Sequence, residues 1–213
     1  MSERRSPEFQ PWGLEGIRAG RKTMTRRAMN PQPHPDFLAR GVVRVVPQWP
    51  EQNGVRWFMA DGLSELTACP HGQPGTVWAL REPLIPCAGI VYLDGTVVVD
   101  RRNGRKPIPW GWKAHRITAR FMPAWAARDY LTLKAVRVER LQAISITDCL
   151  AEGIDLDADY NDYGSGGKHR DTFAALWDSI NGKKHPWESN PWVWVYVFGD
   201  YVRQPGRPME KRS

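Results

Sequence analysis

Cysteine is scarce in this sequence, and the few cysteines are scattered. Cys69, Cys87 and Cys149 lie far apart in a chain of 213 residues, and no Cys-x-x-Cys pair occurs. This spacing supports neither a disulfide framework nor a structural zinc site. Cys69 and His71 in "ACPHG" could form half of a metal site, but a turn is the favoured interpretation. We therefore expect no metal and no cofactor.

Long hydrophobic runs are missing as well. No apolar stretch approaches the ~18 residues that a membrane-spanning helix needs. The opening residues, "MSERRSPEF", contain no apolar segment of the kind found in signal peptides. We expect a cytoplasmic protein without a membrane partner. The sequence leaves the oligomeric state open, and we favour a monomer.

Glycine, proline and basic residues, in contrast, are abundant. The 19 Gly and 18 Pro predict many turns and short elements, and the hydrophobic fraction of 41% is enough for a core. The net charge is +7 and the pI is about 9.5. This balance favours polyanionic partners such as nucleic acid or nucleotides, although an ordinary basic surface would have the same composition.

Short strands separated by turns dominate the expected secondary structure. Strands are predicted at 41–47, 54–59, 76–80, 131–141 and 192–198, with a hairpin over 89–100 that turns at Asp94-Gly95. Helices are predicted at 11–20, at 144–154 with Thr147 as the N-cap, and at 170–182. Both faces of strand 192–198 are apolar, which predicts a central strand. Strands outnumber helices, so we expect an α+β protein built on a small barrel.

One domain accounts for the organisation of the chain. We expect a flexible N-terminus over 1–10, a single domain over 11–200, and a basic flexible tail over 201–213. Within the domain, residues 31–70 and 88–118 read as expanded loops and hairpins.

The stretch "AGRKTMTRR", residues 19–27, concentrates positive charge around two threonines. It fits an ordinary surface strand, a cradle for an anionic ligand, or a catalytic Lys and Thr. In a flat strand Lys22 and Thr25 would point to opposite faces, so they could converge only if the chain bends between them. The simplest role of Thr23 and Thr25 is strand formation.

Five sequence motifs together resemble the ASCH family, especially its phage and prophage members. They are "IRAGRKTMTRR", "GQPGTVWALRE", "MPAWAAR", "VERLQAISITDCLAEGI" and "FAALWDSING…NPWVWVYVF". They match in order and spacing over roughly residues 11–30, 72–86 and 119–198. The resemblance implies a PUA-like β-barrel with flanking short helices and a cleft. Such folds commonly bind RNA or modified nucleosides.

The resemblance also implies an activity. Some small ASCH proteins are amidohydrolases that remove the acetyl group from 4-acetylcytidine, and their proposed catalytic set maps onto Lys22, Thr25 and Glu152. The present chain is longer than those enzymes, and it has Thr76 where phage relatives usually show an Asp. A Thr hydroxyl needs an adjacent base, and a Lys can act as one when burial or neighbouring cations lower its pKa. Glu152 could protonate the departing amine, or it could simply lie on the helix surface.

Several further residues are candidates for ligand binding. Arg21, Arg26 and Arg27 surround Lys22, and a guanidinium group suits phosphate; the alternative is a solvated strand edge. Arg81 and Glu82 could line the cleft or form a salt bridge beneath the barrel.

The 11 Trp residues are expected to lie mostly in the core. Trp110 and Trp112 differ, because they sit in a Pro/Gly loop beside Lys113. Aromatic and basic residues interleaved in this way form stacking platforms for bases, although a loop that folds back onto the core fits equally well.

Two functions remain in view. The first is an ASCH-type protein that hydrolyses an N-acylated cytosine nucleoside. The alternative is a non-catalytic module of phage origin that binds RNA or a modified base. In either case the expected ligand is a nucleoside or single-stranded nucleic acid, with RNA favoured. A phage accessory protein that binds a host protein is a weaker third possibility.

Overall fold

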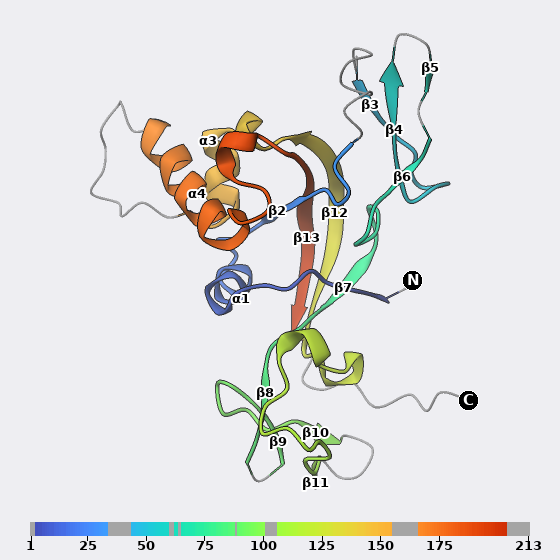
Figure 1. The fold of residues 1–213 in the computed structure, drawn as a ribbon. Helices are drawn as coiled ribbons and strands as arrows, with labels where there is room; N and C mark the ends of the chain where they lie inside the picture. Colours follow the sequence, from blue (N-terminus) through green and yellow to red (C-terminus); the bar gives the residue numbers. More distant parts are fainter. Residues whose placement is uncertain are drawn as a thin grey trace.

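The computed structural model describes residues 3–33, 44–59, 62–63, 65–87, 89–100, 106–154 and 166–203. These residues form a mixed α+β fold around one curled, mainly antiparallel sheet, which makes half of a barrel and is accompanied by few helices (Figure 1). The expected α+β class is confirmed. Residues 204–213, most of the tail expected to be basic and flexible, lie outside the described part of the chain.

The curled sheet contains five strands. Their order is β1 (Glu3–Arg5), β7 (Val77–Leu80), β12 (Asp129–Arg140), β13 (Trp192–Arg203) and β2 (Met24–Ala28). The pair β1–β7 is parallel, and the other pairs are antiparallel. β13 lies between β12 and β2, so the prediction of a central strand is confirmed. β2, which carries the last four residues of the "AGRKTMTRR" stretch, is an edge strand of this sheet.

The alternating side chains of β13 explain why it is central. Trp194 and Tyr196 pack into a core cluster with Trp78, while Val193 and Val195 pack into a second cluster under the helices. All five side chains are at most 2% exposed. A strand buried on both faces reads as a continuous hydrophobic run, which is how this strand was identifiable from sequence.

Among the described residues, three α-helices flank the sheet: α1 (Pro11–Arg18), α3 (Ile146–Ala151) and α4 (Gly166–Asn181). The N-cap of α3 is Ser145, whose hydroxyl accepts a hydrogen bond from Asp148 N at 3.1 Å, so the expectation of Thr147 as the cap is wrong. The helix begins two residues earlier than its pattern suggested, and Thr147 lies in its first turn. None of the described helices is long and apolar enough to cross a membrane.

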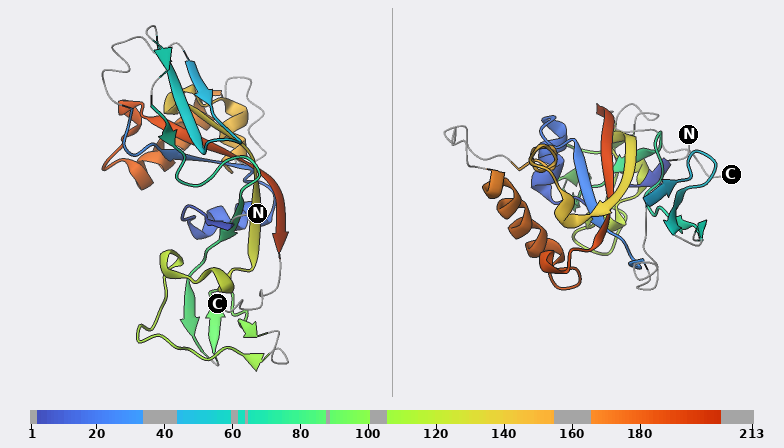
Figure 2. Two further views of the ribbon diagram at one scale, coloured as in Figure 1. Left: turned by 90° about the vertical axis from the view of Figure 1, so that its right-hand side faces the viewer. Right: turned by 90° about the horizontal axis from the view of Figure 1, so that it is seen from above.

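Two groups of short strands extend the sheet at opposite ends (Figures 1 and 2). One contains β3 (Arg44–Pro47), β4 (Gly54–Met59), β5 (Gly62–Leu63) and β6 (Thr67–Ala68). The other contains β8 (Leu84–Pro86), β9 (Ile90–Tyr92), β10 (Val99–Asp100) and β11 (Lys106–Pro107). Short 3-10 helices η2 (Ala119–Phe121), η3 (Ala124–Ala126), η4 (Leu141–Ala143) and η5 (Trp187–Ser189) complete the described structure. The predicted turn at Asp94-Gly95 is present, and Gly95 has a φ of 81°.

Residues 3–10 differ from the expectation of a flexible N-terminus over 1–10. β1 pairs with β7, Ser6 is 1% exposed, and Phe9 is 8% exposed. The physical reason is a long-range strand partner, which the polar composition of this segment did not reveal. As a result, residues 8–10 are held in place and form part of the site described next.

Candidate functional site

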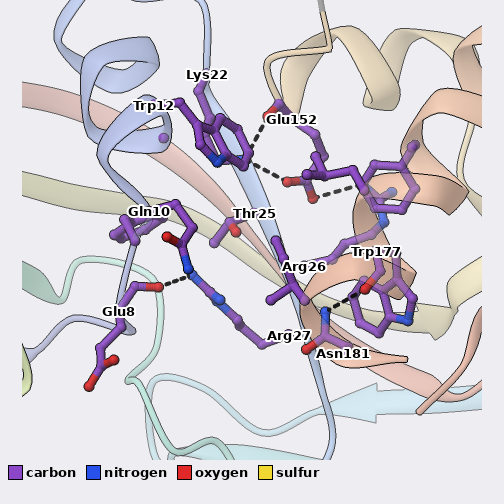
Figure 3. Close-up of a pocket in the computed structure, with 15 residues that line it drawn as sticks. Glu8, Gln10, Trp12, Lys22, Thr25, Arg26, Arg27, Glu152, Trp177 and Asn181 are labelled. Carbon is purple, nitrogen blue, oxygen red and sulfur yellow. Dashed lines mark hydrogen bonds and ion pairs between the residues drawn. The ribbon is translucent and has the colours of Figure 1, made fainter. Parts of the chain in front are cut away.

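A pocket lies where α1, the edge strand β2, the end of α3 and α4 meet (Figure 3). Its cavity volume is about 250 Å³. The lining residues come from four segments of the chain: Glu8, Phe9, Gln10, Trp12 and Gly13; Lys22, Thr25, Arg26 and Arg27; Glu152; and Phe173, Leu176, Trp177, Ile180 and Asn181. Lys22, Thr25 and Glu152, which the sequence put forward as a catalytic set, therefore line one cavity.

Lys22 reaches this pocket because it precedes β2 rather than forming part of it. The backbone N–H of Lys22 bonds to Gly16 O at 3.0 Å, and β2 begins only at Met24. The bend that the sequence required between Lys22 and Thr25 is thus the end of the α1–β2 connection. The aliphatic part of Lys22 packs closely against Gly16 and Gly153. A Cβ atom added at Gly16 would lie 3.1 Å from Lys22 Cβ, and one added at Gly153 would lie 3.3 Å from it, both closer than ordinary van der Waals contact.

Lys22 and Glu152 form a buried ion pair. Nζ of Lys22 lies 2.7 Å from Oε2 of Glu152 and donates a second hydrogen bond to its main-chain oxygen at 2.6 Å. The two residues are 5% and 4% exposed. Burial lowers the pKa of Lys22, and the charges of Arg27 and Arg26 lower it further, while the carboxylate of Glu152 opposes the shift. The pocket therefore holds a lysine whose neutral form is easier to reach than usual.

Thr25 offers an uncommitted hydroxyl beside this pair. The residue is 4% exposed and lines the cavity, and its backbone pairs with Tyr196 of β13. No hydrogen-bond partner of its hydroxyl occurs among the residues that the structure describes, Lys22 included. In Figure 3 Thr25 appears between the Lys22–Glu152 pair and Arg27. Its hydroxyl is available to a ligand or a water molecule in the pocket.

Arg26 is committed to carboxylates of the protein itself. It is 4% exposed, and its guanidinium donates to Glu139 at 2.6 Å, to Asp148 at 2.5 Å and to Glu152 at 3.3 Å. Both sequence-based alternatives for Arg26, a phosphate ligand and a solvated edge residue, give way to a buried structural role. Arg26 fixes one carboxylate oxygen of Glu152 while Lys22 holds the other.

Arg27 and Arg21 differ in their relation to the pocket. Arg27 lines it, donates from Nη2 to Glu8 O at 2.6 Å, and lies 5.2 Å from the centre of the Phe9 ring. Burial lowers the pKa of Arg27. Arg21 is exposed and does not line this cavity.

Arg81 and Glu82 lie outside this pocket. Arg128 donates to both carboxylate oxygens of Glu82 at 2.6 and 2.8 Å, and Arg18 adds a contact at 2.9 Å. Arg81 donates to two main-chain oxygens, those of Ser6 and Arg120. For Glu82 the salt-bridge alternative is the one found, and its carboxylate also borders a second pocket.

The second pocket adjoins the first. Its cavity volume is about 490 Å³, and its lining includes Arg18, Glu82 and Arg116. The two pockets share Glu8, Phe9 and Gln10. This short segment is a common wall between them.

Trp110, Trp112 and Lys113 do not contribute to either pocket. The rings of Trp110 and Trp112 are in edge contact, with their centroids 4.9 Å apart. The rings of Trp112 and Trp125 are stacked, with centroids 6.5 Å apart and an interplanar angle of 9°. Both side chains pack against the hydrophobic cluster of the β8–β9 region, while Lys113 is exposed. The loop therefore folds back on the core, as one of the two sequence-based interpretations proposed.

The sequence did not predict the aromatic residues that line the pocket or the carboxylates that pair with Arg26. Phe173 and Trp177 lie on the apolar face of the helix predicted at 170–182, and the same apolar stripe continues to Ile180, which is 46% exposed and lines the pocket. An apolar stripe longer than the core beneath it was the available signal. Glu139 and Asp148 carried no signal, because their meeting with Arg26 depends on the packing of α3 against the sheet.

The described part of the chain contains no group of three or more His, Cys, Asp and Glu side chains that could hold a metal ion. Comparison with protein-family models, with curated proteins and with solved structures finds nothing that matches the chain.

Proposed function

We propose that this protein is an amidohydrolase that removes the acyl group from an N-acylated cytosine nucleoside, on a PUA-like fold of the ASCH type. The observation that carries the proposal is the buried Lys22–Glu152 pair beside the unbonded hydroxyl of Thr25 in one pocket. These are the three residues that the ASCH resemblance names. The curled half-barrel with few helices is compatible with such a fold.

The pair supplies a base and an acid in one step. Transfer of a proton from Lys22 to Glu152 across their 2.7 Å contact leaves a neutral amine and a neutral carboxylic acid. The amine takes the proton of Thr25 as its oxygen attacks the acyl carbon, and Glu152 protonates the departing cytosine nitrogen. The amide C–N bond breaks, an acyl ester forms on Thr25, and water then hydrolyses this ester to release the acid. The ammonium group of Lys22 stabilises the oxyanion between these steps.

The pocket suits a planar ligand of modest size. Its volume of about 250 Å³ lies just below the roughly 300–1,000 Å³ of typical small-molecule sites, so it holds the acylated base and leaves the sugar at the mouth. Phe9, Trp12, Phe173 and Trp177 supply aromatic surface around it. Stacking of a base on such rings contributes about 1–3 kcal/mol.

The direct test is hydrolysis of 4-acetylcytidine by the purified protein, with free cytidine measured by chromatography. Thr25→Val keeps the shape of the side chain and removes the hydroxyl, so it should lower kcat/KM by about 10²–10⁴-fold. Thr23→Val is the matched control, because Thr23 is exposed and does not line the pocket. No cytidine from wild-type protein on a panel of N4-acylated cytidines would rule out the proposal.

One observation favours a second candidate, a non-catalytic module that binds a modified base or RNA. Nζ of Lys22 directs both of its hydrogen bonds to Glu152 and none to Thr25, so catalysis requires the amine to move. In a binding module this pair would instead be a fixed polar wall. Binding of 4-acetylcytidine without release of cytidine, unaffected by Thr25→Val, would identify this function.

A further inference from the structure

Two of the three cations that line the first pocket are paired directly with carboxylates. Lys22 is paired with Glu152, and Arg26 is paired with Glu139, Asp148 and Glu152. Arg27, the third cation of the lining, makes no ion pair with any carboxylate among the described residues. Arg27 is therefore the lining cation that has no direct carboxylate partner among the described residues, and the carboxylates of Glu152 and Glu8 act on it only from a distance.

The guanidinium of Arg27 is held in position and has donors left over. Nη2 is fixed by Glu8 O at 2.6 Å, and the ring of Phe9 lies beneath the group at 5.2 Å. Nε is buried and has no hydrogen-bond partner in the described structure. An arginine carries five N–H donors, and leaving them unpaired at a buried site is unfavourable. A fixed, planar, partly unpaired guanidinium is suited to bidentate recognition of a carboxylate or phosphate.

We propose that Arg27 binds an anionic oxygen group, a phosphate or a carboxylate, that the ligand of this pocket carries. The rest of the ligand is identified by the proposed function, on which this inference rests. Thr25 and Arg27 are two residues apart on β2 and so project to the same side of the strand, with Cα atoms about 7 Å apart. The anion therefore lies within the length of one nucleoside from the acyl carbon that Thr25 attacks.

Two sources of the anion satisfy this geometry. The 5′-phosphate of a nucleotide or of an RNA strand is one, and a carboxylate at the far end of a dicarboxylic acyl group is the other. Both would form charge-assisted hydrogen bonds with Arg27, and each such interaction contributes enough to change affinity by about 10- to 100-fold. The experiment distinguishes them by pairing each anionic ligand with a neutral counterpart.

Binding is measured by calorimetry in the Thr25→Val background, so that ligands are not consumed. The first pair is 4-acetylcytidine 5′-monophosphate against 4-acetylcytidine. The second is N4-succinylcytidine against N4-butanoylcytidine. We expect one anionic ligand to bind at least about tenfold more tightly than its neutral partner, and the pair that shows this preference identifies the source.

Substitution of Arg27 assigns the preference to this residue. Arg27→Gln should abolish it, and Arg27→Lys, which keeps the charge but loses the planar fork, should retain part of it. Lys183→Gln, which removes an exposed positive charge outside the pocket, is the control for net charge, and thermal melting of each variant checks folding. Equal affinity for the members of both pairs, failure of both anionic ligands to bind, or a preference that survives Arg27→Gln would overturn the inference.

The result is separable from the fate of the proposed function. An anion preference without turnover in wild-type protein would leave the role of Arg27 intact and remove the enzymatic proposal. Turnover of neutral and anionic substrates with equal kcat/KM would support the enzymatic proposal and remove the role of Arg27 in binding an anion.

Discussion

Lys22 and Glu152 are 130 residues apart in the chain, and Nζ of Lys22 bonds both to the carboxylate of Glu152 and to its main-chain oxygen. This double contact joins the α1–β2 connection to the end of α3. The pair is therefore part of the fold as well as part of the candidate site. Variants at these positions must be read for stability and for activity separately.

Removal of the Thr25 hydroxyl should affect activity and leave the fold in place. Thr25→Ala and Thr25→Val should each lower kcat/KM by about 10²–10⁴-fold, the usual scale for a group that takes part in proton transfer or nucleophilic attack. Because the hydroxyl makes no hydrogen bond within the described structure, the free energy of unfolding should change by less than about 1 kcal/mol for the Val variant. Steady-state kinetics and urea unfolding measure the two effects. Near-normal kcat/KM in both variants would exclude Thr25 as the nucleophile.

Breaking the Lys22–Glu152 pair from one side should destabilise the protein. Lys22→Met leaves the buried carboxylate of Glu152 with Arg26 alone, and a cost of about 3–5 kcal/mol is expected. The double variant Lys22→Met/Glu152→Met should be more stable than the sum of the single changes predicts, because it leaves neither partner unpaired. Chemical unfolding of the four proteins gives the coupling energy. A strictly additive result would show that the contact contributes nothing.

The rate should fall at high pH. The Lys22–Glu152 pair carries one proton, which Glu152 delivers to the leaving nitrogen, and burial lowers the pKa of Lys22; kcat/KM should therefore fall along a limb whose midpoint lies below the ordinary lysine value of about 10.4. The sign for stability is the opposite. Between the folded pKa and about 10.4 the unfolded chain binds the extra proton, so the contribution of Lys22 to the free energy of unfolding grows as pH rises. A pH profile of kcat/KM that is flat over this range would contradict the assignment of Lys22 as the base.

The tryptophan loop should matter for stability and not for ligand binding. Trp112→Ala removes the contacts with Trp110 and Trp125, and the partly buried position predicts a loss of about 2 kcal/mol, below the ~3–5 kcal/mol of a fully buried Trp. Affinity for single-stranded RNA should stay within about twofold of wild type, since stacking on a platform residue would contribute about 1–3 kcal/mol. Filter binding at a fixed salt concentration measures this affinity for wild-type protein and for the variant. A tenfold loss of affinity in a folded variant would restore the stacking-platform interpretation.

The elements that local pattern determines were predictable from the sequence. Strand 192–198 was visible as a continuous apolar run and the strand at 54–59 as a short apolar segment, and both are local signals. The helix predicted at 144–154 is also present in part as α3, and Gly153 after it has a φ of 86°, which glycine tolerates best.

The features that depend on distant partners were not predictable. β1 forms by pairing with the edge of β7, and the residues between 3 and 10 contain no local pattern that predicts this pairing. The burial of Arg26 depends on Glu139 and Asp148, which reach it from β12 and α3. From the sequence, Arg26 and Arg27 were equal candidates for binding an anionic ligand. In the structure, Arg26 is paired with carboxylates of the protein, whereas Arg27 lines the pocket without such a pair among the described residues.

The wall formed by Glu8, Phe9 and Gln10 has a consequence for the two cavities that it separates. Any displacement of this partition that enlarges one cavity takes space from the other. Two ligands that each require such room would compete without touching, and by thermodynamic linkage the penalty that the first imposes on the second equals the penalty in the opposite direction. Residues 8–10 thus form a boundary shared by two compartments.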